Sequence, residues 1–192
     1  MPATPVSLLD RLQRQPDAQS WERLVQLYEP FIRRWLRDPA LGPDADDLLQ
    51  EVLAVLVRDL PAFRRQRSGS FRAWLRTVTV NKVNEWWRKR PARQPAAGGT
   101  DAALRLQQLE DPASGLSRLW DEEHDRYVAR RLLELLEPEF SPATWRAFRS
   151  QVIDGRPASA TAAEVGLSVN AVLIAKSRVL TRLRQEIEGL LD

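Results

Sequence analysis

The chain lacks cysteine altogether and has a single histidine. Without thiols it forms neither disulfides nor thiolate metal sites, and one imidazole is too few for a typical zinc site. No apolar run approaches the roughly 18 residues that a membrane span needs, and no signal-peptide pattern precedes Ser7. We therefore expect a cytoplasmic protein that inserts into no membrane and binds no metal or other cofactor.

Alternation of apolar and polar residues, the pattern of a half-buried strand, is also missing. Apolar residues instead recur at spacings of three and four, the pattern of amphipathic helices. Hydrophobic residues make up 43% of the 192 and charged residues 29%, as is ordinary for a globular protein. The sequence therefore predicts an all-α fold.

A stretch rich in proline, glycine and alanine, residues 91–100, divides the chain. This composition is typical of a flexible linker. We expect one small helical domain at 7–92, a linker at 93–117 and a second small helical domain at 118–190. Each should have a modest core of its own. A weaker helical stretch is expected inside the linker, at 101–108.

Capping residues and prolines mark the ends of the expected helices. Asp44 is a suitable N-cap for a helix that Pro61 stops, and Ser70 is suitable for the helix that follows. Pro30 is expected to interrupt and kink the preceding helix, which runs to Arg37. The helices expected after the linker cover 117–136, 141–154, 159–165 and 168–190.

Charge is arranged in blocks, although the net charge is only +3. Ten basic residues lie between Arg64 and Arg93, with Glu85 as the only acid among them. The stretch 101–139 is acidic, and the stretch 146–184 is basic again. Two basic blocks separated by an acidic one indicate two contacts with a polyanion. Such charge gives affinity but no sequence preference.

Near the end of the chain, Ala162, Gly166 and Val172 form the frame of a helix-turn-helix. Two helices that meet at roughly 90–120° need a small residue where they approach, a glycine at the turn and a branched apolar residue between them. The segment after the turn carries side chains suited to the major groove of DNA. They are Asn170, Lys176, Ser177, Arg178, Arg182 and Arg184. The alternative is an αα-hairpin with a solvated basic face.

The helix expected after residue 70 combines an apolar stripe with a basic end. The basic run 88–90 complements the helix dipole but is also suited to phosphate contact. Asn81 and Asn84 lie on the polar side, where an amide can read or hold an unpaired base. Trp86 and Trp87 point about 100° apart. We expect one of them in the core, and the other either stacked on single-stranded bases or covering a helix junction.

Four motifs follow one another along the chain: Asp44-Ala-Asp-Asp-Leu-Leu-Gln-Glu-Val52, Phe71-x-x-Trp-Leu-x-x-Val-x-x-Asn81, the basic run, and the helix-turn-helix ending Ala175-Lys-Ser-Arg178. In this order they resemble the extracytoplasmic-function (ECF) subfamily of bacterial RNA polymerase sigma factors. The resemblance implies a first domain that binds the β′ clamp helices of core RNA polymerase and melts and reads the minus-ten promoter element. It implies a second domain that reads the minus-thirty-five element and touches the β flap.

The resemblance also assigns individual residues. Those that match the polymerase-binding motif are Asp44, Asp47, Gln50 and Glu51. Those that match the minus-ten loop, the following helix and its basic tract are Arg64, Arg65, Arg67, Asn81, Arg88, Lys89 and Arg90. Those that match the recognition helix for the minus-thirty-five element are Asn170, Lys176, Ser177 and Arg178. The chain departs from the pattern at Thr181, where many members carry another arginine.

The sequence therefore predicts a sigma factor that gives core RNA polymerase promoter specificity and is not an enzyme. Its expected partners are the core polymerase and promoter DNA; an anti-sigma factor or a regulatory kinase is compatible with the family, but no residue identifies either. One alternative is a helix-turn-helix regulator that dimerises on a palindromic site without polymerase. Another is a nuclease that holds Mg²⁺ with Asp44, Asp46 and Asp47. For these three aspartates, capping of a helix N-terminus is the structural alternative.

Overall fold

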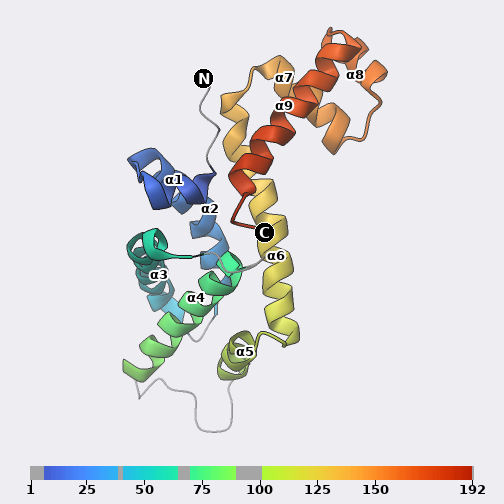
Figure 1. Ribbon diagram of the computed structural model, residues 1–192. Helices are drawn as coiled ribbons and strands as arrows, with labels where there is room; N and C mark the ends of the chain where they lie inside the picture. Colours follow the sequence, from blue (N-terminus) through green and yellow to red (C-terminus); the bar gives the residue numbers. More distant parts are fainter. Residues whose placement is uncertain (1–6, 39–40, 65–69, 90–100, 192) are drawn as a thin grey trace.

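A computed structural model of the chain describes residues 7–38, 41–64, 70–89 and 101–191 (Figure 1). Every regular element in these ranges is helical, which confirms the all-α prediction. The α-helices are α1 (Leu8–Arg14), α2 (Ala18–Trp35), α3 (Ala45–Asp59), α4 (Ser70–Lys89), α5 (Asp101–Glu110), α6 (Gly115–Leu136), α7 (Pro142–Phe148), α8 (Ala158–Val165) and α9 (Val169–Ile187). No single helix among the described residues is long and apolar enough to span a membrane; α8 and α9 meet that test only together, across a bend of 101°.

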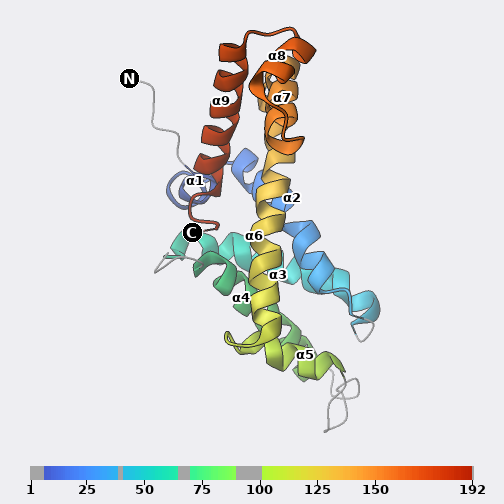
Figure 2. The same cartoon turned by 90° about the vertical axis from the view of Figure 1, so that its right-hand side faces the viewer.

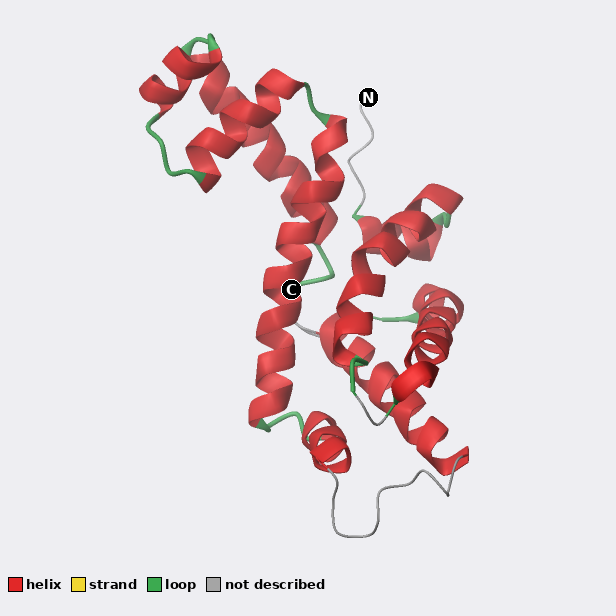
Figure 3. Cartoon of the chain, turned by 180° about the vertical axis from the view of Figure 1, so that it is seen from behind, coloured by secondary structure: helices red, strands yellow, loops and turns green. Residues whose placement is uncertain are grey.

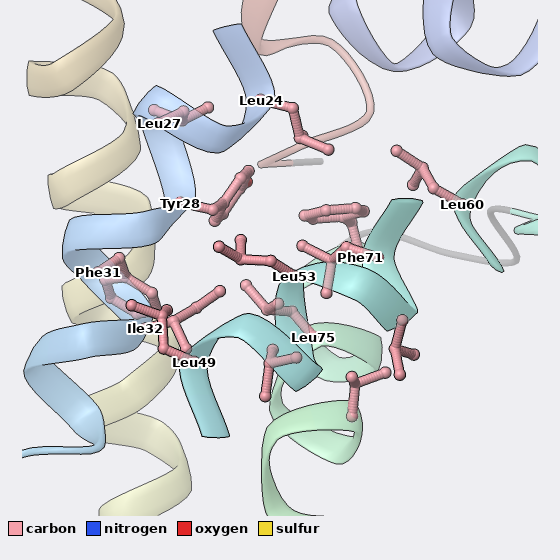
Figure 4. Close-up of a cluster of buried hydrophobic side chains, with 14 of the residues drawn as sticks. Leu24, Leu27, Tyr28, Phe31, Ile32, Leu49, Leu53, Leu60, Phe71 and Leu75 are labelled. Atoms are coloured by element: carbon pink, nitrogen blue, oxygen red, sulfur yellow. The ribbon is translucent and has the colours of Figure 1, made fainter. Parts of the chain in front are cut away.

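Helices α1 to α4, which we call the first unit, enclose a large apolar core (Figure 4). The spacings of three and four place the apolar residues of each helix on its inner face. The side chains labelled in Figure 4 are Leu24, Leu27, Tyr28, Phe31 and Ile32 from α2, Leu49 and Leu53 from α3, Leu60, and Phe71 and Leu75 from α4. All of them are buried. This core fixes α3 and α4 side by side and determines which of their faces remain exposed.

The start of α3 differs from the prediction in one detail. Asp44 occupies the N-cap position, but its side chain makes no capping hydrogen bond. Capping needs an extended backbone, whereas Asp44 closes the short 3-10 turn Gly42–Asp44 and has φ −78° and ψ −7°. By contrast, Ser7 and Asp17 have extended backbones and cap α1 and α2 with their side chains.

Pro30 lies inside α2, which runs through it without the predicted interruption. Proline has no amide hydrogen, so the carbonyl of Gln26, one turn earlier, loses its usual helical partner. The Nε of Arg131, in α6, donates to this carbonyl at 3.4 Å. A side chain of α6 therefore supplies the hydrogen bond that the carbonyl of Gln26 loses to the proline.

The long helix α6 packs against α2 of the first unit and against α9, and it leads in the chain to α7 (Figures 2 and 3). After Ser117, its buried residues follow one another at a spacing of four: Trp120, His124, Val128, Leu132 and Leu136. The ring of Trp120 packs against Phe31 and Trp35, with centroid distances of 5.0 and 4.7 Å. One stripe of α6 therefore contacts the first unit along most of its length.

The expectation that each domain would have a core of its own is only partly met. Helices α7, α8 and α9, which we call the second unit, contain two small apolar clusters. The core of the first unit, however, includes Trp120, Val128 and Leu132 of α6 and Leu190 after α9. Residues on both sides of segment 93–117 thus share one interior.

The helix-turn-helix predicted from Ala162, Gly166 and Val172 is confirmed. Helices α8 and α9 meet at 101°. Gly166 has φ +69°, a left-handed conformation that favours glycine. Ala162 and Val172 are buried together with Ala175 between the two helices. The hydroxyl of Ser168 caps α9, as its sequence position suggests.

The only histidine of the chain, His124, is fully buried in α6. Its Nε2 lies 3.2 Å from the hydroxyl of Tyr28, and its Nδ1 lies 3.0 Å from a carboxylate oxygen of Asp125. Burial lowers the pKa of His124, and the guanidinium of Arg72 adds to this, although Asp125 and Asp121 act in the opposite direction. The imidazole is therefore neutral in the folded protein at neutral pH.

We expect the free energy of unfolding to decrease as the pH falls below about 6.5, the ordinary pKa of histidine. The unfolded chain takes up a proton at His124 near that pH, whereas the folded chain does so only at lower pH. The stability is therefore fully present above this value and declines below it. Urea unfolding at several pH values between about 5 and 8 measures the effect. In His124→Gln the free energy of unfolding should depend less on pH over this range. An unchanged pH dependence in this variant would show that His124 is not its source.

Candidate nucleic-acid and polymerase interface

One face of α3 is exposed and mostly acidic. Asp47, Gln50 and Glu51 are exposed, because the opposite face of the helix is buried in the core. Asp44 is half-buried at the start of the helix. One carboxylate oxygen of Glu51 lies 3.4 Å from the Nζ of Lys82 in α4. Three of the four residues expected to bind polymerase therefore share one accessible surface.

The three aspartates at the start of α3 do not come together as metal ligands. Asp46 forms an ion pair with Arg33 of α2, while Asp47 is exposed. Within the part of the chain that the structure describes, no three histidine, aspartate or glutamate side chains are placed to share a metal ion. This arrangement gives no support to the nuclease alternative.

The outer side of α4 carries the amide and basic residues expected to contact the minus-ten element. Asn81, Arg88 and Lys89 are exposed. Asn84 is half-buried and donates to a carboxylate oxygen of Glu110, in α5, at 2.5 Å. The structure therefore leaves Asn81 accessible, whereas Asn84 is bonded to α5, a helix inside the predicted linker.

The basic tract around α4 is partly neutralised. Hydrogen bonds from Lys89 and Lys82, at 2.7 and 2.9 Å, lower the pKa of Glu85 to about 2. Arg64 is exposed and donates to the carbonyl oxygen of Phe63 at 3.2 Å. The remaining residues predicted for this contact, Arg65, Arg67 and Arg90, lie outside the described residues.

Both tryptophans at the end of α4 are buried, which leaves the helix junction, and not base stacking, as the place of the second one. Their rings lie 4.7 Å apart at an angle of 75°. Trp87 lines a small apolar pocket together with Leu106 and Leu109 of α5. Helix α5 thus covers the second face of α4, and Trp87 fills a helix junction rather than an open stacking surface.

Two arginines of the first basic block turn inward, which the sequence did not reveal. Arg76 is buried and lies 2.6 Å from the carboxylate of Asp121. Arg72 lies 3.1 Å from the carboxylate of Asp125 and 3.6 Å from that of Asp121. These two arginines therefore form ion pairs with the acidic first half of α6 and hold it against α4.

The outer face of α9 carries the residues predicted to read the minus-thirty-five element. Asn170, Ser177 and Arg178 are exposed, and Lys176 is half-buried. Val172, Ala175 and Val179 occupy the opposite, buried face. The helix therefore presents its polar and basic residues outward from the helix-turn-helix.

Further along α9, Arg182, one of the side chains expected to suit the major groove, forms ion pairs within the protein instead. Its guanidinium lies 2.8 Å from the carboxylate of Glu139 and 2.5 Å from that of Glu186. Glu186 is fully buried and also pairs with Arg11 and Arg23 of the first unit. These ion pairs join the end of α9 to α1 and α2.

Several proteins of known function are similar to this chain over most of its length. The sequence matches the family described as Sigma-70 region 2 over residues 22–93. It is 29% identical over 177 residues to the ECF RNA polymerase sigma factor SigD of Mycobacterium tuberculosis, which covers 89% of this chain and 78% of that protein. It is 30% identical over 158 residues to the RNA polymerase sigma-E factor of Streptomyces avermitilis, which covers 82% and 76%. A sigma-E factor of Streptomyces coelicolor is 29% identical over 155 residues, which covers 81% and 76%.

Proposed function

The chain belongs to the ECF subfamily of RNA polymerase sigma factors, and from this premise we propose how its surfaces divide the work of transcription initiation. The residues of 7–92 bind core polymerase and the minus-ten element, and those of 118–190 bind the minus-thirty-five element. The observation that carries this division is that most of the described motif residues are exposed, on three separate helices, α3, α4 and α9. The protein acts in the cytoplasm as an initiation factor and catalyses no reaction itself.

The exposed face of α3 is the proposed contact with the β′ clamp helices. Asp47, Gln50 and Glu51 follow one another at helical spacings, so they present two carboxylates and an amide on one surface. Such a surface is complementary to a basic partner and steers its approach. Asp44, half-buried at the helix start, lies at the edge of this contact.

The exposed side of α4 is the proposed contact with the melted minus-ten element. Asn81 offers an amide to a base edge, and Arg88 and Lys89 offer positive charge to phosphates. We assign Arg64, which is also exposed, to the same contact. Neither tryptophan of α4 takes part, because both are buried.

In α9, Asn170, Ser177 and Arg178 form the proposed contact with the minus-thirty-five element. A recognition helix places the residues of its N-terminal half against base edges in the major groove. The 101° angle between α8 and α9 leaves this half of the helix exposed. The same unit is the proposed partner of the β flap.

Asp47→Ala and Gln50→Ala are each expected to weaken binding to core RNA polymerase by about fivefold to tenfold, the effect of removing one complementary contact of about 1 kcal/mol. Neither side chain supports the core of the first unit, so the helical content should not change. Fluorescence titration of labelled full-length protein with purified core polymerase measures the affinity, and run-off transcription measures the activity. Glu122→Ala removes an exposed carboxylate from α6 and is the matched control. If wild type and all three variants bound core polymerase with equal affinity, the proposal that α3 contacts the polymerase would be wrong.

A further inference from the structure

The outer face of α9 is more apolar than its predicted role in reading DNA would suggest. Val169 is 45% exposed, Leu173 48% and Ile174 43%. None of them supports the helix-turn-helix, because its small core is formed by the opposite face of α9. Five of the eight large apolar side chains that are exposed among the described residues lie between Val152 and Ile174. Three of them, Val169, Leu173 and Ile174, lie within six residues of one helix, unlike the scattered apolar residues of an ordinary surface.

These apolar side chains lie among the residues proposed to contact DNA. With 3.6 residues per turn, Asn170, Leu173, Ile174 and Ser177 fall on one face of the helix. All four are exposed. Leu173 and Ile174 are the fifth and sixth residues of α9 and thus lie in its N-terminal half. That half is the part of a recognition helix that reaches base edges.

The charges around this face favour a nucleic acid over an apolar peptide as its partner. Arg178, one turn after Ile174, is exposed, as is Arg184 further along the helix. Positive charge beside the apolar residues suits a phosphate backbone on either side of a groove. Inside the major groove, the only apolar group that a base pair presents is the C5-methyl group of thymine.

We propose that Leu173 and Ile174 contact thymine methyl groups in the major groove of the upstream promoter element. This inference rests on the proposed role of α9 as the recognition helix. Asn170, one turn before Ile174, can pair with an adenine on the same face. The chain therefore reads T·A pairs in this element by apolar contact, in addition to any polar contact by Asn170 or Arg178.

The test uses holoenzyme made from the full chain and core RNA polymerase. A promoter is selected from a pool with a randomised upstream block, and each thymine of that block is then replaced by deoxyuridine, which removes only the methyl group. We expect initiation to fall about fourfold for each contacted methyl, the effect of losing one buried methyl-sized apolar group. Leu173→Ala and Ile174→Ala should each remove the sensitivity to one or more of these replacements.

Two control variants separate this effect from others. Leu104→Ala removes a leucine that is 50% exposed on α5, far from α9 in Figure 1, and should keep the full sensitivity to deoxyuridine. Arg178→Ala should reduce the dependence of DNA binding on salt while keeping the sensitivity to the methyl group.

Each contrary outcome has a distinct meaning. If a thymine-containing upstream block is selected but deoxyuridine is tolerated everywhere, the methyl contact is overturned while the sigma-factor assignment stands. If Leu173→Ala and Ile174→Ala weaken association with core polymerase and leave the response to deoxyuridine unchanged, this face binds a protein and the proposal is again overturned. If no promoter supports initiation by wild-type holoenzyme, the proposed function fails and the inference with it.

Discussion

Replacing Trp120 by alanine is expected to lower the free energy of unfolding by about 4 kcal/mol, within the range found for tryptophan in a protein core. Trp120 is fully buried and packs on the rings of Phe31 and Trp35, so the truncation would leave a cavity between α2 and α6. Those helices meet through the same stripe of α6, and we expect the loss to loosen the whole contact. Urea unfolding followed by circular dichroism measures the change.

Two further variants make this test specific. The Nε1 of Trp120 has no hydrogen-bond partner among the described residues, so Trp120→Phe removes ring volume without breaking a hydrogen bond. It should therefore retain more than half of the stability that Trp120→Ala loses. Leu119→Ala changes the exposed neighbour and should have an effect of less than about 0.5 kcal/mol. Equal stability of Trp120→Ala and wild type would show that α6 does not pack on α2 in solution.

Glu186→Ala is expected to lower the free energy of unfolding by about 3 kcal/mol, because it removes the buried acid from a cluster of three arginines. The carboxylate lies 3.1 Å from Arg11, 3.4 Å from Arg23 and 2.5 Å from Arg182. Each arginine remains partly exposed, so water screens part of the uncompensated charge and we expect the lower end of the range. The end of α9 should then detach from α1 and α2.

The measurement for Glu186 is urea unfolding combined with hydrogen exchange of the α1 amides, which report the contact with α9 directly. Glu188→Ala removes an exposed carboxylate two residues further on and is the matched control. If the two variants had the same stability and the same exchange rates, the ion-pair cluster would contribute nothing to the contact.

The elements that the sequence predicted best are those set by local signals. The helix-turn-helix depends on a glycine with positive φ and on two small or branched residues within eleven positions, from Ala162 to Val172. Serines at helix starts act as the caps that their positions suggest, for example Ser141 and Ser168. Asp44 makes no capping bond, because the preceding turn sets its backbone, and Ser70, also predicted as a cap, is instead the first residue of α4.

The features that the sequence did not reveal depend on contacts between distant segments. Arg72 and Arg76 look like part of a DNA-binding block until α6 brings Asp121 beside them. Trp86 and Trp87 can both be buried only because α5 covers one side of α4. Helical spacing describes one helix at a time, so it cannot show which face a second helix will cover. In α3 and α9 the exposed residues are those opposite the apolar stripe of each helix, as helical spacing suggests; they include Asp47, Gln50, Asn170 and Arg178.

The position of Leu190 in the core of the first unit has a consequence for folding during protein synthesis. Leu8, Leu9 and Leu12 are made before Leu190, which belongs to the same core and follows almost 180 residues later. At bacterial translation rates this interval is on the order of ten seconds or more. The core of the first unit therefore reaches its final packing only after α9 and Leu190 have been made.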